Sequence, residues 1–78
     1  MTEPEILDKL TRILRDLLAD DSIVLTMETE REDVPNWDSF NYLNFIVAAE
    51  IEFGVKFKTG EVESFEHVGA IVGRIKEM

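Results

Sequence analysis

Residues 38–54, DSFNYLNFIVAAEIEFG, form the most apolar segment of the chain and decide its fold. Asp38 is a good cap for the start of a helix, and Gly54 is a good stop because glycine readily adopts the left-handed conformation. Apolar residues recur between them at helical spacing. The segment therefore predicts a helix over residues 39–53, with Ser39 in its first turn.

This predicted helix carries two apolar arcs when its residues are placed at about 100° per position. The arc that we expect to face the core holds Tyr42, Phe45, Ile46, Ala49 and Phe53. The second arc holds Phe40, Leu43, Val47 and Ile51. A helix of a small bundle needs only one buried stripe, so the second arc is either covered by a loop or exposed to a partner or ligand.

The segments on both sides also indicate helices. Thr2 and Glu5 have capping-box spacing and precede a helical apolar pattern that Asp20-Asp21-Ser22 ends. Residues 20–37 show no sustained period, which predicts a long loop. We expect the apolar side chains of this loop to pack on the core: Ile23, Leu25 and Met27.

The C-terminal third predicts a short helical turn near residues 61–64 and then a last helix capped by Ser64. Gly69 and Gly73 lie inside this last helix, where we expect close packing of helices to explain them. Its buried stripe should comprise Val68, Ile71, Val72 and Ile75. The prediction is an all-α, four-helix bundle with a short third helix and a long loop between the first two helices.

Composition limits the function. The chain has 78 residues, which suits a single domain over 1–78, and its formal charge of −9 argues against binding nucleic acid or anionic membranes. No apolar run is long enough for a membrane span, and the acidic N-terminus lacks the features of a signal peptide. We therefore expect a cytoplasmic monomer. The chain lacks cysteine, and its acidic clusters lack a calcium-loop pattern, so we predict no metal site.

Ser39 is the residue whose position indicates chemistry. It follows the capping Asp38, where backbone N–H groups point outward and the helix dipole is positive. A phosphate esterified at this serine would be stabilised by both effects. Serine is also common at helix starts for structural reasons alone, so the position by itself does not establish a site.

Several segments in order resemble the acyl carrier protein family. They are Asp38-Ser39-Phe40 at the start of an apolar helix, Glu50-Ile51-Glu52-Phe53-Gly54-Val55 at its end, and Phe65-Glu66-His67-Val68-Gly69-Ala70-Ile71 before the last helix. The family pattern is Asp-Ser-Leu, a Glu-rich stretch ending in Phe-Gly, and an apolar-x-x-Val-Gly start. The resemblance covers the whole chain, including its acidity and long first loop.

The resemblance implies that Ser39 receives a 4′-phosphopantetheine arm from coenzyme A, added by a magnesium-using phosphopantetheinyl transferase. The thiol of the arm would hold acyl groups as thioesters, which explains a thioester carrier without cysteine. Asp38 and Phe40 would flank the attachment site. The expected partners are acyl ligases, acyltransferases or synthases of fatty acid, lipid or polyketide-type biosynthesis, with basic or apolar docking faces.

The chain departs from the family pattern at several positions. Phe40 replaces the usual leucine, and Trp37 stands where small residues are frequent. Asn41, Asn44 and Ile51 replace acidic recognition residues, so we expect a specialised stand-alone carrier rather than the fatty acid carrier of general metabolism. The expected docking residues are Trp37, Asn41, Leu43, Asn44, Val47, Glu50 and Ile51.

Other functions fit the sequence less well than a carrier does. An enzyme is disfavoured because nucleophilic or acid–base catalysis needs a base near the nucleophile, and the one histidine, His67, suits a surface or capping role. An aminoacyl or peptidyl carrier shares the serine and the fold but usually has a less acidic surface. A helical interaction module that is never modified would use the second apolar arc as a plain protein-binding surface.

Overall fold

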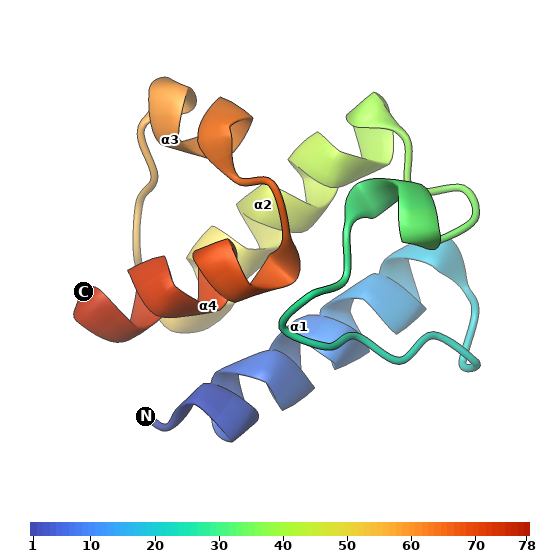
Figure 1. The fold of residues 1–78 in the computed structure, drawn as a ribbon, viewed down its shortest axis with the longest axis horizontal. Coiled ribbons are helices and arrows are strands. Elements are labelled where there is room, and N and C mark those ends of the chain that lie inside the picture. The colour runs from blue at the N-terminus through green and yellow to red at the C-terminus, as the bar shows by residue number, and fades with distance from the viewer.

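The computed structural model describes residues 1–78 and shows four α-helices joined by loops (Figure 1). A 3₁₀ turn, η1, interrupts the first and longest loop. These elements are α1 (Glu3–Leu18), η1 (Arg31–Asp33), α2 (Ser39–Phe53), α3 (Thr59–Ser64) and α4 (Val68–Glu77). The predicted bundle, with its short third helix and long first loop, is confirmed. No helix is both long and apolar enough to cross a membrane.

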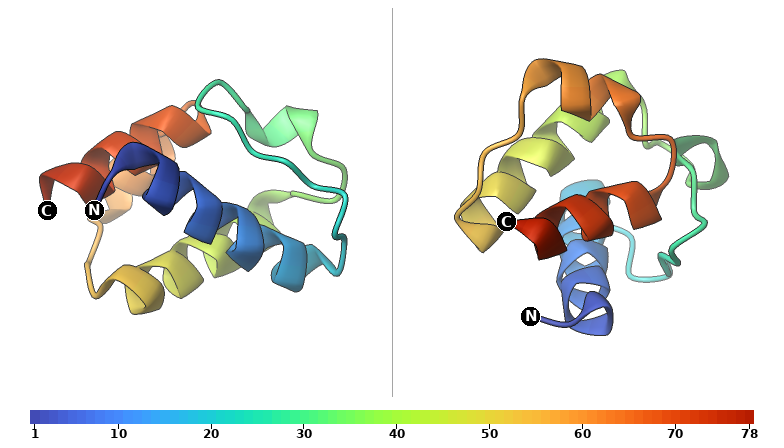
Figure 2. Two further views of the ribbon diagram at one scale, coloured as in Figure 1. Left: turned by 90° about the horizontal axis from the view of Figure 1, so that it is seen from below. Right: turned by 60° about the vertical axis from the view of Figure 1, so that its left-hand side comes forward.

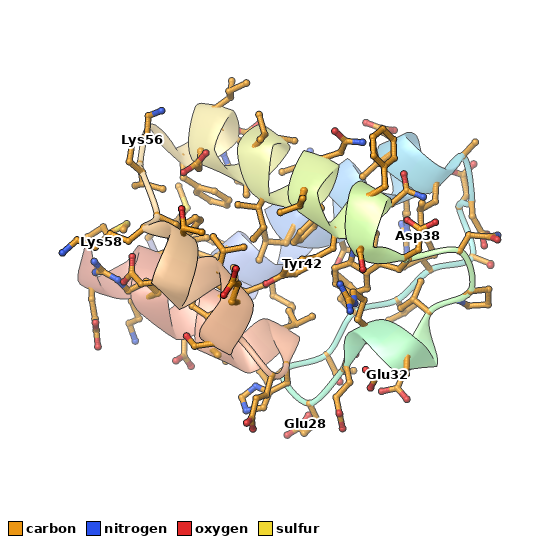
Figure 3. The ribbon with its side chains drawn as sticks, turned by 90° about the horizontal axis from the view of Figure 1, so that it is seen from above. Glu28, Glu32, Asp38, Tyr42, Lys56 and Lys58 are labelled. Carbon is orange, nitrogen blue, oxygen red and sulfur yellow. The ribbon has the colours of Figure 1, made fainter.

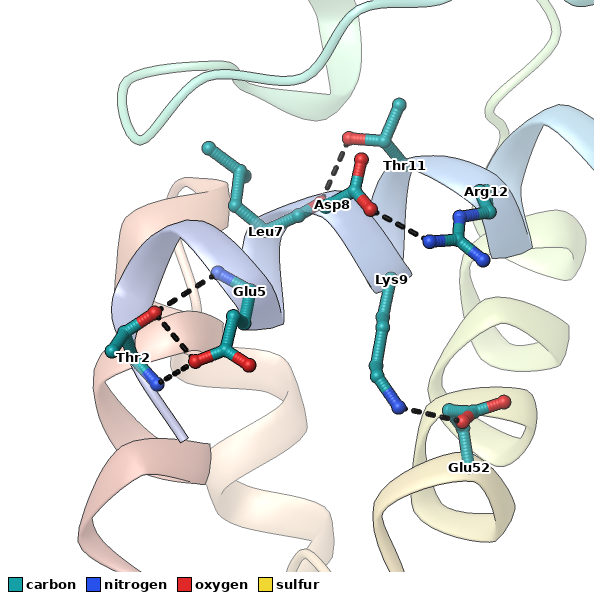
Figure 4. Close-up of polar contacts among 8 residues, drawn as sticks. All are labelled: Thr2, Glu5, Leu7, Asp8, Lys9, Thr11, Arg12 and Glu52. Atoms are coloured by element: carbon teal, nitrogen blue, oxygen red, sulfur yellow. Dashed lines mark hydrogen bonds and ion pairs between the residues drawn. The ribbon is translucent and has the colours of Figure 1, made fainter.

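Helix α1 begins with the predicted capping box (Figure 4). The backbone N–H of Glu5 donates to Thr2 Oγ1 at 3.4 Å, and the backbone N–H of Thr2 donates to the Glu5 carboxylate at 3.0 Å. On the outer face, Lys9 Nζ lies 3.4 Å from Glu52 Oε2 of α2. This ion pair is exposed, so it orients the two helices more than it stabilises them.

Helix α1 packs against both α2 and α4 and forms the centre of the core (Figure 2). Side chains spaced along α1 are buried because they face the other two helices. The largest fully buried side chains are Ile6, Leu10 and Leu14 of α1, Phe45 of α2, and Val68, Ile71 and Val72 of α4. The predicted core stripes of the second and last helices are confirmed, and the apolar pattern of the first helix supplies the third stripe.

The long loop is part of the core rather than a free connection. Ile23 and Leu25 are buried, as predicted, and Met27 packs against the core. Arg15 Nε of α1 donates to the carbonyl of Ile23 at 2.7 Å. The backbone N–H of Val68 then donates to Thr29 O at 2.9 Å. The loop therefore satisfies amides at the start of α4, which have no partner within the helix.

The two glycines of α4 have different surroundings. Gly69 donates its N–H to Met27 O at 2.8 Å, and a Cβ placed on it would lie only 2.6 Å from that oxygen. A Cβ on Gly73 would meet nothing within 4 Å. Close approach explains Gly69, although the neighbour is the loop rather than a helix. The expected packing role of Gly73 is wrong.

The start of the last helix also differs from the prediction. Ser64 ends α3, and its hydroxyl donates to Glu61 O at 2.7 Å, so it does not cap α4. Phe65 is extended and packs edge-on against Phe57, with ring centroids 5.5 Å apart. The extended Phe65, held by this contact, ends α3 before α4 begins. His67 is the actual cap, because its Nδ1 accepts the N–H of Ala70 at 3.2 Å.

Candidate functional site

Ser39 is the first residue of α2 and is exposed. Asp38 fixes this end of the helix, since its carboxylate accepts the N–H of Asn41 at 2.9 Å. The side-chain amide of Asn41 donates to Asn36 O at 2.9 Å and so ties the helix to the preceding turn. These bonds fix the start of the helix that carries Ser39, at the position that the sequence predicted.

The start of α2 has unused hydrogen-bond donors. The backbone N–H groups of Ser39 and Phe40 find no acceptor within the chain, because the cap carboxylate and the first helical bond serve Asn41 and Tyr42. The positive end of the helix dipole adds to these donors. An anion attached to Ser39 would therefore be stabilised where it is attached.

Ser39 lies at the wall of a cleft of about 580 Å³. The cleft is bounded by η1, α2, α3 and the start of α4. Its apolar lining comprises Trp37, Leu43, Val62, Phe65, Val68 and Ile71. Its charged lining comprises Glu30, Arg31, Glu32, Glu63 and Glu66. A group attached to Ser39 can therefore lie against the apolar side chains of this cleft.

Tyr42 joins three walls of this cleft (Figure 3). Its hydroxyl donates to Val62 O of α3 at 2.7 Å, and the Arg31 guanidinium carbon lies 5.1 Å from its ring centroid. Burial raises the pKa of the Tyr42 hydroxyl, and the positive charge of Arg31 partly opposes that shift. The phenol therefore stays protonated at neutral pH and keeps its bond to α3.

The second apolar arc of α2 is exposed and is not covered by the long loop. The exposed fractions are 73% for Phe40, 57% for Leu43, 53% for Val47 and 78% for Ile51. We call these four residues the outer stripe. Large apolar side chains aligned on one helix face mark a surface for interaction. The stripe begins beside Ser39 and runs along α2, so a partner on it would lie next to the serine.

Three expected docking residues have other roles in the structure. Trp37 is only 5% exposed and packs edge-on against Phe45, with ring centroids 5.1 Å apart, so its prediction as a docking residue is wrong. Its large apolar ring is more stable in the core than in water. Asn41 bonds the preceding turn, and Glu50 Oε2 accepts the N–H of Phe57 at 2.8 Å. Asn44 remains exposed.

Sequence reasoning missed two parts of the cleft. Arg31 received no role, although it is the one basic residue within the acidic run of residues 28–33. A single basic residue among acidic neighbours was the feature of the sequence that could have pointed to Arg31. Residues 63–67 lie far from Ser39 in sequence, and only the fold brings them to the same cleft. Lys56 and Lys58 lie toward the other end of α2 from Asp38, away from the cleft (Figure 3).

No family model matches the chain. Among solved structures, the chain is similar to the solution NMR structure of holo acyl carrier protein from Geobacter metallireducens, at 41% sequence identity and a TM-score of 0.83. The match covers 91% of this chain and 82% of that protein. The two proteins therefore share their sequence as well as their fold over nearly the whole of this chain. The chain belongs to the acyl carrier protein family.

Proposed function

We propose that the protein carries acyl groups on a 4′-phosphopantetheine arm esterified to Ser39 Oγ. The observation that carries this proposal is the exposed Ser39 hydroxyl at the first turn of α2, on the wall of an apolar cleft. A phosphopantetheinyl transferase would join the serine oxygen to the phosphorus of the arm. The serine proton is lost and the nucleotide part of coenzyme A is released.

The residues around Ser39 fit such a group. The phosphodiester needs hydrogen-bond donors, and the free N–H groups of Ser39 and Phe40 are available beside the serine. Asp38 holds the helix start, and the exposed Phe40 ring stands next to the attachment point. The arm supplies a thiol for thioester formation, which a chain without cysteine cannot supply itself.

Membership of the family makes the chain a carrier on which other enzymes act, rather than a catalyst. Its partners would be the transferase and an acyl ligase, acyltransferase or synthase of fatty acid, lipid or polyketide-type biosynthesis. We expect the carrier to work as a monomer in the cytoplasm. These partners must recognise the surface around Ser39.

The outer stripe supports a specialised carrier with apolar docking. Phe40, Val47 and Ile51 are more than half exposed, whereas the nearby Glu50 carboxylate is already bonded to the backbone of Phe57. A partner would therefore gain more from burying the stripe than from pairing with Glu50. Leu43 and Asn44 complete the exposed face, and the net charge of −9 would speed association with basic partners.

The direct test is the intact mass of the protein after incubation with coenzyme A and a promiscuous phosphopantetheinyl transferase. We expect a gain of one phosphopantetheine that Ser39→Ala abolishes. Ser22→Ala is the matched control, because Ser22 is also exposed and should leave the gain unchanged. A failure of the unchanged protein to gain mass, while a known carrier is modified in parallel, would contradict the proposal.

An aminoacyl or peptidyl carrier is the second candidate. Glu30, Glu32, Glu63 and Glu66 line the cleft, and these carboxylates would attract the ammonium group of an aminoacyl thioester. They are exposed, so the attraction is weak and the apolar lining remains the stronger feature. Loading the modified protein with a fatty acyl ligase and with an aminoacyl-adenylating enzyme, side by side, distinguishes the two cargoes.

A further inference from the structure

Trp37 holds a buried hydrogen-bond donor that has no partner. Its Nε1 is the one buried side-chain nitrogen or oxygen of the chain that forms no hydrogen bond. The ring is tightly held, since it is 5% exposed and contacts both Tyr42 and Phe45. Buried polar groups are nearly always paired in folded proteins, so an isolated donor of this kind calls for a specific reason.

The position of Trp37 supplies that reason. The indole lines the same cleft as Ser39, and the two residues are neighbours in the turn that leads into α2. Two other polar side chains of the lining have partners: the Tyr42 hydroxyl donates to Val62 O, and the Thr29 hydroxyl lies 3.1 Å from that of Thr26. The indole N–H is therefore an unpaired donor, shielded from solvent, on a residue of the wall from which an attached group would extend.

Arg31 adds a second donor to this wall. Its guanidinium lies over the Tyr42 ring at 5.1 Å and takes part in none of the ion pairs of the chain. It is the only lysine or arginine that lines the cleft. The carboxylates of the lining are exposed, and none accepts from the indole. The wall around Ser39 thus offers two side-chain donors without partners, the Trp37 indole and the Arg31 guanidinium.

We propose that the indole N–H of Trp37 donates to an acceptor oxygen on the group attached to Ser39. This inference rests on the proposed function and concerns how that same site selects what it holds. Either an amide carbonyl of the arm or an oxygen substituent on the acyl chain could supply this acceptor oxygen. A plain alkyl chain would leave this buried donor without an acceptor, whereas a group with an oxygen at this place would pair it, which is favourable. The cleft therefore favours attached groups that place an oxygen at Trp37.

The single tryptophan makes this proposal directly measurable, because the labelled protein has one indole N–H signal in an NMR spectrum. Four forms are compared: the unmodified protein, the protein with the arm alone, and the arm bearing either an alkanoyl chain or a β-hydroxyacyl chain of equal length. An amide link in place of the thioester prevents hydrolysis. Mass spectrometry verifies attachment at Ser39 in each form.

We expect the indole proton to move downfield and to exchange with water about fivefold more slowly once it gains an acceptor. A change already present with the arm alone identifies an arm carbonyl as the acceptor. A change confined to the β-hydroxyacyl form identifies the cargo. An indole signal that stays unchanged in all forms, with attachment verified, overturns the inference and leaves the carrier function standing. Absence of attachment overturns both.

Two variants separate a hydrogen bond from a general effect on packing. Trp37→Phe keeps an aromatic ring and removes the N–H, so attachment should raise its melting temperature less than it raises that of the unchanged protein. An equal rise in both proteins would contradict the proposal. Arg31→Met removes the neighbouring charge and leaves the indole in place. If the indole response disappears in this variant, the response came from Arg31 and the proposal is wrong.

Discussion

The hydroxyl of Tyr42, on α2, donates a hydrogen bond of 2.7 Å to the carbonyl of Val62, on α3. Tyr42 also lines the cleft beside Ser39 and stacks with Arg31 of η1. One side chain thus connects the helix that bears the serine, the short helix and the long loop.

Replacing Tyr42 by phenylalanine removes this hydrogen bond and keeps the ring. We expect Tyr42→Phe to lower the free energy of unfolding by about 1 kcal/mol, which corresponds to a fall in melting temperature of roughly 4–8 °C. Amide hydrogen exchange should rise in α3 more than in α1, because only α3 loses a tether. Equal acceleration in both helices would show that the bond is not a local link between α2 and α3.

The two glycines of α4 give a matched pair. Gly69→Ala forces its Cβ against the backbone oxygen of Met27, 2.6 Å away, and should destabilise the protein by about 1–3 kcal/mol. Gly73→Ala meets no obstacle and should stabilise α4 by up to about 1 kcal/mol. Chemical denaturation measures both changes. Similar effects of the two substitutions would contradict the close approach at Gly69.

His67 caps α4 through Nδ1, which accepts the N–H of Ala70. His67→Ala should cost about 1 kcal/mol of stability because that N–H loses its acceptor. His67→Asp restores an acceptor of the preferred type and places a negative charge at the positive end of the helix. It should therefore be at least as stable as the unchanged protein in thermal unfolding. A less stable aspartate variant would mean that the imidazole acts through packing instead.

Glu61 links α3 to α4 by its ion pair with Arg74. Its carboxylate accepts the N–H of Lys58 and pairs with Arg74, and both interactions lower its pKa below 4.5. Because the folded-state pKa is lowered, this contribution to stability is complete above the unfolded-state pKa. It is lost as the pH falls through the lower, folded-state value.

Glu61→Gln should therefore reduce the dependence of unfolding on pH below about pH 4.5, measured as thermal melts across an acidic series. Glu63→Gln, also on α3, removes the same charge without touching Arg74 and serves as the control. If both variants melt with the same pH dependence, net charge rather than the link between α3 and α4 explains the acid sensitivity.

The outer stripe predicts how partners dock. Val47→Ala and Ile51→Ala should slow transfer of the arm or of the cargo more than Glu50→Gln does, because the stripe offers apolar area and the Glu50 carboxylate is engaged with Phe57. Both apolar side chains are mostly exposed, so thermal stability should hardly change. Steady-state rates with the transferase provide the measurement. A larger effect of Glu50→Gln would favour docking by charge.

Local signals were enough for most of the fold. The caps at Thr2 and Asp38 and the stop at Gly54 depend on neighbours within a few residues, so their predicted positions are confirmed. The boundary between the last two helices was wrong because Ser64 has the composition of a cap, whereas the packing of Phe65 on Phe57 decides where the chain leaves the helix. That contact is tertiary and leaves no local pattern.

The site was predictable only in part. Ser39 could be proposed as the attachment residue from its place at the helix start and from the motif around it. Trp37 was expected to contact partners because it stands next to the motif, where the family often has small residues, but its ring lies in the core. Its unpaired Nε1 could not be foreseen, since the absence of a partner depends on every side chain that packs around the ring.

The hydrogen bonds from Val68 to Thr29 and from Gly69 to Met27 have a mechanical consequence for the cleft. They join the long loop to α4, so those two walls of the cleft form one connected unit. The opposite wall is the six-residue α3, which is held by the Tyr42 bond and the Arg74 ion pair. Breaking those two links would therefore release α3 while the two joined walls stay connected.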